Sequence, residues 1–225
     1  MKIKKLISAL VLGSMLVGLS GCNITDFSAE NLLRPPKAVG DEAEIEQLIA
    51  KTADSGYTLK YPKNGKFRSA IIMTDLDGND SNEAVAFFRN SAETSSVHML
   101  VMYSKDNSWE IASDNIFETT DIDSVDFADL TGNGKAEIIV NSTTYTPNVG
   151  KLSCYSYSEG KTNEVGSGQS CSSFVTGDFD NDGTSEIMSL VLYTTENEAL
   201  ASMLDYNEDS KSLYAKAMAN MDPNV

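Results

Sequence analysis

A short acidic motif occurs three times in this chain, and it constrains the fold more than any other feature of the sequence. Residues 74–85, 128–139 and 177–188 align without a gap and read TDLDGNDSNEAV, ADLTGNGKAEII and GDFDNDGTSEIM. Their leading aspartates, Asp75, Asp129 and Asp178, are 54 and 49 residues apart. A period of this length holds four short strands and three turns, so each period is expected to form one sheet.

The segments between the motifs predict strands. Apolar runs at 69–74, 84–89, 97–103 and 109–112 are separated by polar turn clusters, a spacing typical of antiparallel all-β domains. The repeat predicts sheets over residues 67–113, 123–166 and 171 to about 218, in which each acidic motif joins the first strand to the second. Four-stranded sheets at this period are the blades of β-propellers. We therefore expect an all-β, propeller-like array of about three four-stranded blades.

A short helix and a first strand are expected before the repeats. Residues 41–53 have acidic residues in the first turn and Lys51 in the last. One helical face carries Ile45, Leu48, Ile49 and Thr52. Residues 57–61 predict a strand that stops at Pro62. The folded domain is therefore expected to span residues 41–225.

The first 21 residues have the pattern of an export signal. Three lysines precede an apolar run over residues 6–19, and no acidic residue is present. The run ends in Leu-Ser-Gly-Cys at 19–22, which resembles the lipobox of bacterial lipoproteins. The resemblance implies cleavage after Gly21 and attachment of a diacylglyceryl group to the sulfur of Cys22. It predicts a lipid-anchored protein on the extracytoplasmic face of the cell membrane; the alternative is an ordinary secretory signal with an incidental cysteine.

The net charge of the chain excludes one class of partner, and the composition of residues 22–40 favours a flexible tether. The chain has 33 acidic and 17 basic residues, a formal net charge of −16 at pH 7, and removal of residues 1–21 would make it more negative by three lysines. A surface this acidic repels phosphate backbones, so nucleic acid is not an expected partner. Residues 22–40 are polar, contain Pro35 and Pro36 and lack periodicity, so they are expected to form a flexible tether.

The three motifs resemble the FG-GAP or VCBS repeats of bacterial surface proteins and integrin alpha-subunit propellers. The family pattern is DxDxDG, then two residues, an aspartate and an apolar strand, and the likeness covers about 150 residues of the chain. The third copy matches with Asp178, Asp180, Asp182 and Gly183, and it has Glu186 at the ninth position. The first copy has Asp75, Asp77, Asn79 and Glu83, with Asp80 in place of the glycine. The second has Asp129, Thr131, Asn133 and Glu137, and so lacks two carboxylates.

Oxygen ligands at alternate positions of these loops suit calcium. Calcium takes six to eight oxygen ligands, whereas magnesium needs a tighter octahedron and softer metals prefer the His and Cys that this chain scarcely has. We expect structural calcium in the third and first loops, and least of all in the second. The alternative is an acidic β-turn whose side chains accept backbone N–H groups and hold no ion. The longer Glu side chain at position nine would then bond the loop backbone instead of the ion.

The remaining residues of the sequence do not predict an enzymatic activity. The sequence has no GxSxG, HExxH, P-loop or dinucleotide fingerprint. His98, the only histidine, lies in an alternating strand without a Ser, Cys or second His nearby, which favours a structural role. Cys154 and Cys171 could pair outside the cytoplasm, but two small buried residues are the default interpretation.

These observations predict a membrane-anchored, calcium-binding module that presents loops to a protein or a glycan. An enzyme or enzyme subunit with a site on the propeller axis, and a truncated remnant of a longer propeller, are the alternatives. Closed propellers commonly have four to eight blades, and only three are counted here. The uncovered faces of an open array predict self-association or a partner that completes the ring.

Overall fold

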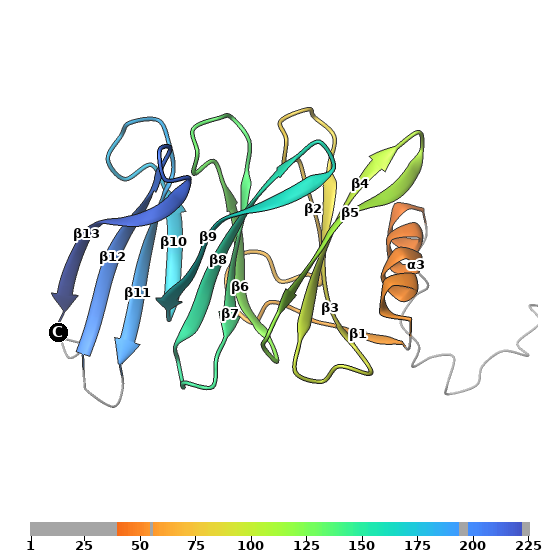
Figure 1. Cartoon of the computed structure of the whole chain (residues 1–225), viewed down its shortest axis with the longest axis horizontal. Helices are drawn as coiled ribbons and strands as arrows, with labels where there is room; N and C mark the ends of the chain where they lie inside the picture. Colours follow the sequence, from red (N-terminus) through yellow and green to blue (C-terminus); the bar gives the residue numbers. More distant parts are fainter. Residues whose placement is uncertain (1–39, 55, 194–197, 222–225) are drawn as a thin grey trace, which may run out of the picture. The chain divides into compact units, whose positions relative to one another are not determined.

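The computed structural model describes residues 40–54, 56–193 and 198–221. The predicted export signal, the lipidation site at Cys22 and the predicted tether lie outside these residues. In the described part of the chain, helix α3 (Asp41–Ala53) precedes strands β1 to β13, as Figure 1 shows.

The strands form three antiparallel sheets, and in each of them four strands that follow one another in the sequence pair in order. Sheet A contains β2 (Ile71–Thr74), β3 (Glu83–Asn90), β4 (Val97–Lys105) and β5 (Ser108–Phe117), with β1 (Tyr57–Leu59) added to β3. Sheet B contains β6 (Ile122–Ala128), β7 (Glu137–Thr143), β8 (Gly150–Ser158) and β9 (Lys161–Cys171). Sheet C contains β10 (Ser173–Gly177), β11 (Glu186–Tyr193), β12 (Glu198–Asn207) and β13 (Ser212–Met221).

The predicted helix and the three predicted four-stranded units are confirmed. Their ends differ from the prediction, because β5, β9 and β13 extend to Phe117, Cys171 and Met221. The predicted strand at 57–61 is shorter, and β1 and β2 pair with different halves of β3. The described residues form no closed ring, so the propeller arrangement stays a prediction.

Sheet B lies between two apolar cores. On one side Ile138 and Tyr155 pack with Val85 and Val101 of sheet A. On the other side Ile139 packs in a core with residues of sheet C, which include Ile187 and Leu204. Both faces of β7 are therefore buried, which explains why this strand is a continuous apolar run at residues 138–140 and does not alternate with polar residues.

Helix α3 covers the face of sheet A that points away from sheet B. Ile45, Ile49 and Ala53 are buried, and they pack with Phe88 and Leu100 of sheet A. Leu48 is partly buried in the same cluster, as its place on the predicted face requires, and the hydroxyl of Thr52 donates to the Leu48 carbonyl at 2.9 Å. The helix thus completes the core at one end of the stacked sheets.

The three acidic motifs form the connections β2–β3, β6–β7 and β10–β11, as predicted, and lie at the same end of the sheets in Figure 1. Adjacent loops contact each other directly. The Ala136 amide donates to the Leu76 carbonyl at 3.1 Å, and the Ser185 amide donates to the Asp129 carbonyl at 2.8 Å. The packing of the sheets therefore brings the loops into one connected row.

Candidate metal centre

All three loops share one backbone conformation, set by the aspartate at position one. In the third loop, the Asp178 carboxylate accepts the amides of Asp182 and Gly183, each at 3.1 Å. Asp75 and Asp129 accept the amides at positions five and six of their own loops. These bonds are the ones expected of an acidic turn, and they leave further lone pairs on each carboxylate.

Position six needs a left-handed backbone. Gly134 and Gly183 adopt φ values of 79° and 95°, which glycine allows without steric cost. Asp80 stands at this position in the first loop and still adopts φ 65°. Asp is among the few residues that tolerate this region, so the departure from the family pattern leaves the loop conformation unchanged.

The glutamate at position nine is anchored by one of its two oxygens. Oε2 of Glu83, Glu137 and Glu186 accepts the backbone amide at position two of its loop, at 2.8 Å in each case. This is the backbone bond that the longer Glu side chain allows. The bond occupies one oxygen only, and the role of the second oxygen distinguishes the third loop from the second.

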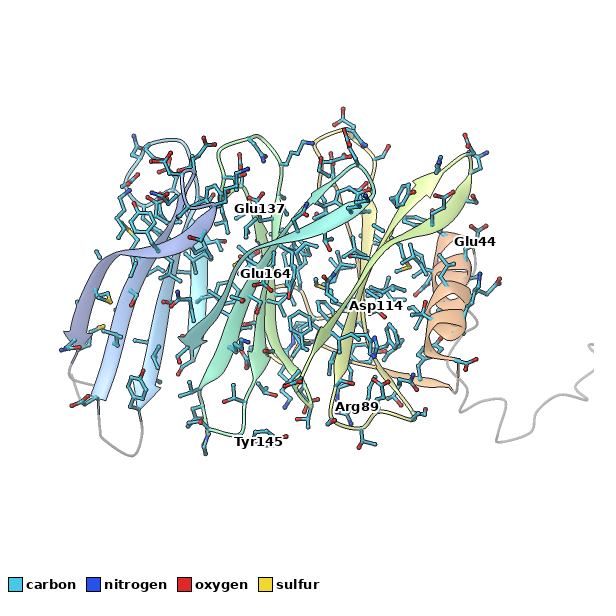
Figure 2. The ribbon with its side chains drawn as sticks, in the orientation of Figure 1. Glu44, Arg89, Asp114, Glu137, Tyr145 and Glu164 are labelled. Atoms are coloured by element: carbon cyan, nitrogen blue, oxygen red, sulfur yellow. The ribbon has the colours of Figure 1, made fainter. Side chains whose placement is uncertain are left out.

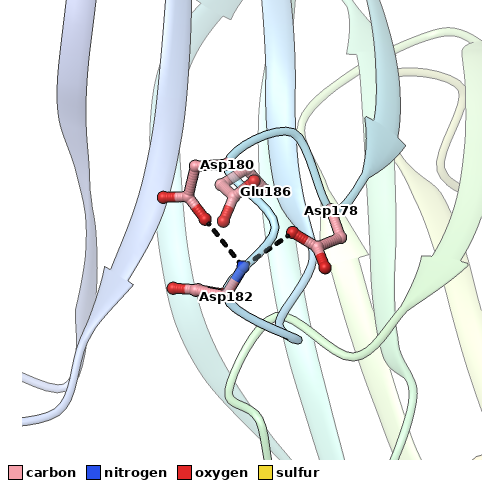
Figure 3. Close-up of side chains that lie close together, drawn as sticks. All are labelled: Asp178, Asp180, Asp182 and Glu186. Carbon is pink, nitrogen blue, oxygen red and sulfur yellow. Dashed lines mark hydrogen bonds between the residues drawn. The ribbon is translucent and has the colours of Figure 1, made fainter.

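In the third loop the second oxygen has no partner and faces other carboxylates. Glu186 is 0% exposed, and its Oε1 has no hydrogen-bond partner among the described residues. Asp178, Asp180, Asp182 and Glu186 each place an oxygen within 4.8 Å of the others, and Figure 3 shows these side chains gathered at the loop. A buried carboxylate oxygen without a donor is costly. A hard cation in this cluster would supply the missing interaction, so the residues fit calcium.

The first loop has a smaller cluster of the same kind. Asp75, Asp77 and Glu83 bring oxygens within 4.8 Å of one another, and Oδ1 of Asp77 is buried without a partner. Burial raises the pKa of Glu83, and the negative charges of Asp77 and Asp75 raise it further. Asn79 accepts the Ser81 amide at 2.7 Å and completes the turn. The first loop therefore also fits a cation, with one carboxylate fewer.

The second loop closes on itself. The Thr131 hydroxyl donates to Oε1 of Glu137 at 3.2 Å, and the Thr131 amide donates to Oε2 at 3.3 Å. Burial raises the pKa of Glu137, but both of its oxygens have donors. Asn133 accepts the Lys135 amide at 2.8 Å. In this loop position three is a threonine and not an aspartate. Its hydroxyl donates to the glutamate oxygen that would otherwise be free to bind a cation.

A lysine at the third loop was not identified from the sequence. Lys216 on β13 forms an ion pair with Asp180, and its ammonium donates to Oδ2 of Asp205 at 2.9 Å. These two carboxylates raise the pKa of Lys216. No sequence signal joins residues 180 and 216, because only the pairing of β11, β12 and β13 brings them together. Lys216 offsets part of the charge in the carboxylate cluster.

Replacing Lys216 by Met is expected to raise calcium affinity at the third loop. A positive charge beside the cluster repels a divalent cation, and its removal should lower the Kd by roughly threefold to tenfold after screening by salt. Isothermal titration measures the change. Lys151→Met is the matched control, because Lys151 is exposed at the start of β8, at the opposite end of the sheets. An equal change in both variants would mean that only the overall charge matters.

His98 and the two described cysteines lie apart from the loops. His98 is buried, stacks on Phe88 with a ring-centroid distance of 4.8 Å, and has its Nδ1 2.9 Å from Oδ1 of Asp114. The strand pairing supplies this acidic partner, which sequence reasoning did not find. Cys154 and Cys171 are free and fully buried, so the prediction of two small buried residues is confirmed. Burial raises the pKa of the Cys171 thiol to about 12.

Comparison with known proteins assigns this chain to no family. No family model and no curated protein matches this sequence. Among the described residues, no helix is both long and apolar enough to cross a membrane. The resemblance of the motifs to FG-GAP and VCBS repeats thus rests on the residues of the loops themselves.

Proposed function

We propose that this protein is an extracytoplasmic lipoprotein, anchored through Cys22, whose repeat loops bind calcium and whose sheets form a non-enzymatic binding or scaffold module for a protein or a glycan. The observation that carries the metal part is the unpartnered, buried Oε1 of Glu186 within a cluster of three aspartates. Calcium would be held by Asp178, Asp180, Asp182 and Glu186 in the third loop. In the first loop it would be held by Asp75, Asp77 and Glu83.

Calcium in this proposal is structural. It would bridge the ends of β10 and β11 in sheet C, and the ends of β2 and β3 in sheet A. The second loop, which is hydrogen-bonded to both neighbours, would then lie between two metal-stabilised loops. The row of loops would form a rigid edge of the module, while the opposite ends of the sheets remain open to a ligand.

Figure 2 shows these two ends of sheet B. Glu137 lies at the end that carries the acidic loops, and Tyr145 lies at the other. Tyr145 is 95% exposed, in the connection between β7 and β8. An exposed tyrosine on a short loop is a common contact residue in binding modules, because its ring offers both apolar area and a hydroxyl. This arrangement favours a binding role over a purely structural one.

Converting the second loop into a third site tests the metal proposal. The wild-type chain should bind two calcium ions, and Thr131→Asp should bind three, because the change removes a hydroxyl donor from Glu137 and adds a carboxylate at position three. Without calcium this variant should melt at a lower temperature, since carboxylates then lie close together without compensation. Titration calorimetry and thermal melts of the detergent-solubilised chain measure both effects.

Thr131→Ser is the matched control, because it keeps the hydroxyl that closes the second loop. It should bind two ions and melt as the wild type does. A wild-type chain that binds no calcium at millimolar concentration would contradict the proposal. A third ion bound by the wild type would contradict the assignment of the second loop.

A further inference from the structure

One face of sheet C is apolar, and its residues belong to none of the core clusters of the described part of the chain. The strand registers place three rows of side chains on it, which are Val175, Met188, Met203 and Ala217; Ser173, Leu190, Ala201 and Ala219; and Leu192, Ala199 and Met221. Only Ser173 is polar. On the edge strands Val175 is 59% exposed and Met221 is 52% exposed, whereas the side chains of the two central strands are half-buried and Ala199 is buried. We call these residues the outer face of sheet C.

The opposite face of the same sheet is the one that packs in the interior. Ile187, Leu204 and Leu213 belong to the core shared with sheet B, and the strands of sheet C contact β6 and β9 there. The outer face alternates with these residues along each strand, so it points away from sheet B. Sheet B, by comparison, buries apolar side chains on both of its faces.

We infer that the outer face of sheet C is a self-association surface, on which the same face of a second copy packs around a two-fold axis. A contiguous apolar patch of this kind on a soluble domain marks an interaction site. At the other end of the stacked sheets, α3 covers the matching face of sheet A. In a second copy the corresponding face of sheet A is covered in the same way, so the contact would be made by its sheet C. A contact between the same face of two copies is symmetric.

Charge supports a second copy as the occupant. The chain carries a net charge of −16, but the three rows contain no charged residue. At the end of the sheet near the third loop, the next row of the face carries Glu186, which is fully buried, and Asp205 nearby pairs with Lys216. Two such faces can meet without burying an unpaired charge, and two sheets packed face to face normally lie about 10 Å apart. The acidic remainder of each copy would repel the other less as salt increases.

The area of the face sets the expected strength. Four strands about 4.8 Å apart, with about five residues each at about 3.3 Å, give a face of roughly 320 Å² per copy. The sum of roughly 600 Å² lies below the lower limit of about 1,000 Å² for a stable interface, in the range of weak and transient contacts. The dimer is therefore expected to be weak and reversible, with a Kd in the micromolar range.

Cysteine cross-linking in membranes of cells that express the full chain tests this inference. Met203→Cys places a thiol on a central strand of the face and should give a cross-linked dimer with a short bis-maleimide. Cys154 and Cys171 are fully buried and should not react, and in the proposed lipoprotein the sulfur of Cys22 carries the lipid and is not a free thiol. Ile111→Cys on β5 of sheet A is the control, because Ile111 is 40% exposed but lies on another sheet. The wild type and this control should give no dimer band.

A second substitution separates a specific contact from random collision. Met188→Asp, added to Met203→Cys, should reduce the dimer band at least tenfold, whereas Ile111→Asp in the same background should not. Sedimentation equilibrium of the detergent-solubilised wild type should show the same micromolar dimer, and a melt of the Met188→Asp chain checks its fold. A monomer at all concentrations, or a cross-link only to a different protein, would overturn the inference.

Discussion

Replacing Glu186 by Gln is expected to remove the share of the calcium stabilisation that comes from the third loop. In the wild type, one oxygen of Glu186 holds the loop backbone and the other faces three aspartates without a donor. Calcium binding to such a site should stabilise only the folded chain. With a Kd of about 10⁻⁴ to 10⁻³ M, typical of extracellular sites, 10 mM calcium adds about 1.4 to 2.7 kcal/mol per site. For a chain of this size that is an increase in Tm of roughly 3 to 11 °C per site.

The same substitution should not destabilise the chain when calcium is absent. The side-chain carbonyl of Gln can still accept the Phe179 amide, and the change removes a buried carboxylate that faces three aspartates. Melts of the wild type and Glu186→Gln, in calcium and in chelator, measure both effects. The prediction is that the two proteins have similar Tm values in chelator and different values in calcium.

Glu137→Gln provides the matched control in the second loop. The geometry of the backbone bond is the same, but both oxygens of Glu137 already have donors within the loop. Its shift in Tm with calcium should equal that of the wild type, although its Tm in chelator should fall because the Thr131 hydroxyl bond is disturbed. If Glu137→Gln lost the calcium effect and Glu186→Gln kept it, the assignment of the sites to the loops would be wrong.

The second large effect is expected at Cys22. A wild-type chain carrying a diacylglyceryl group should be found almost entirely in the membrane fraction and should incorporate a clickable fatty acid. Two acyl chains contribute about 0.8 kcal/mol for each buried CH₂ group, which is enough for stable anchoring. Cys22→Ala removes the sulfur that carries the lipid, so it should abolish the fatty-acid label.

Fatty-acid labelling is the deciding measurement, because an uncleaved signal could itself hold the Cys22→Ala chain at the membrane. Asn23→Ala is the control, since it changes the neighbouring residue and keeps the thiol. It should label as the wild type does. Equal labelling of wild type and Cys22→Ala, or a wild type that is soluble and unlabelled, would show that residues 19–22 are not a lipobox.

The pattern of the sequence was sufficient to predict the elements of the fold, since it depends on local properties. Helix α3 follows from its apolar face, and the three acidic motifs mark three connections of the same kind. The strand ends were less predictable. Polar residues such as those of β9 extend a hairpin because their backbone groups pair with β8, and side-chain polarity does not report this pairing.

The residues of the candidate site were also predictable, but their individual roles were not. The carboxylate count ranks the third loop above the first and the second. It does not reveal that Glu186 has an unpartnered oxygen, or that Thr131 satisfies the corresponding oxygen of Glu137. Both facts depend on hydrogen-bond geometry, in which a hydroxyl in place of a carboxylate at position three changes which groups are satisfied.

The sequence by itself determined the repeat, the β class, the position of each acidic loop and the residues that could bind a cation, because these follow from spacing and residue type along the chain. Only the tertiary structure decided which sheet faces are covered, which carboxylates gather, and that Lys216 lies beside Asp180. The physical reason is that strand pairing and sheet packing join residues far apart in the chain. Burial and charge interactions at a site depend on those neighbours and not on the local sequence.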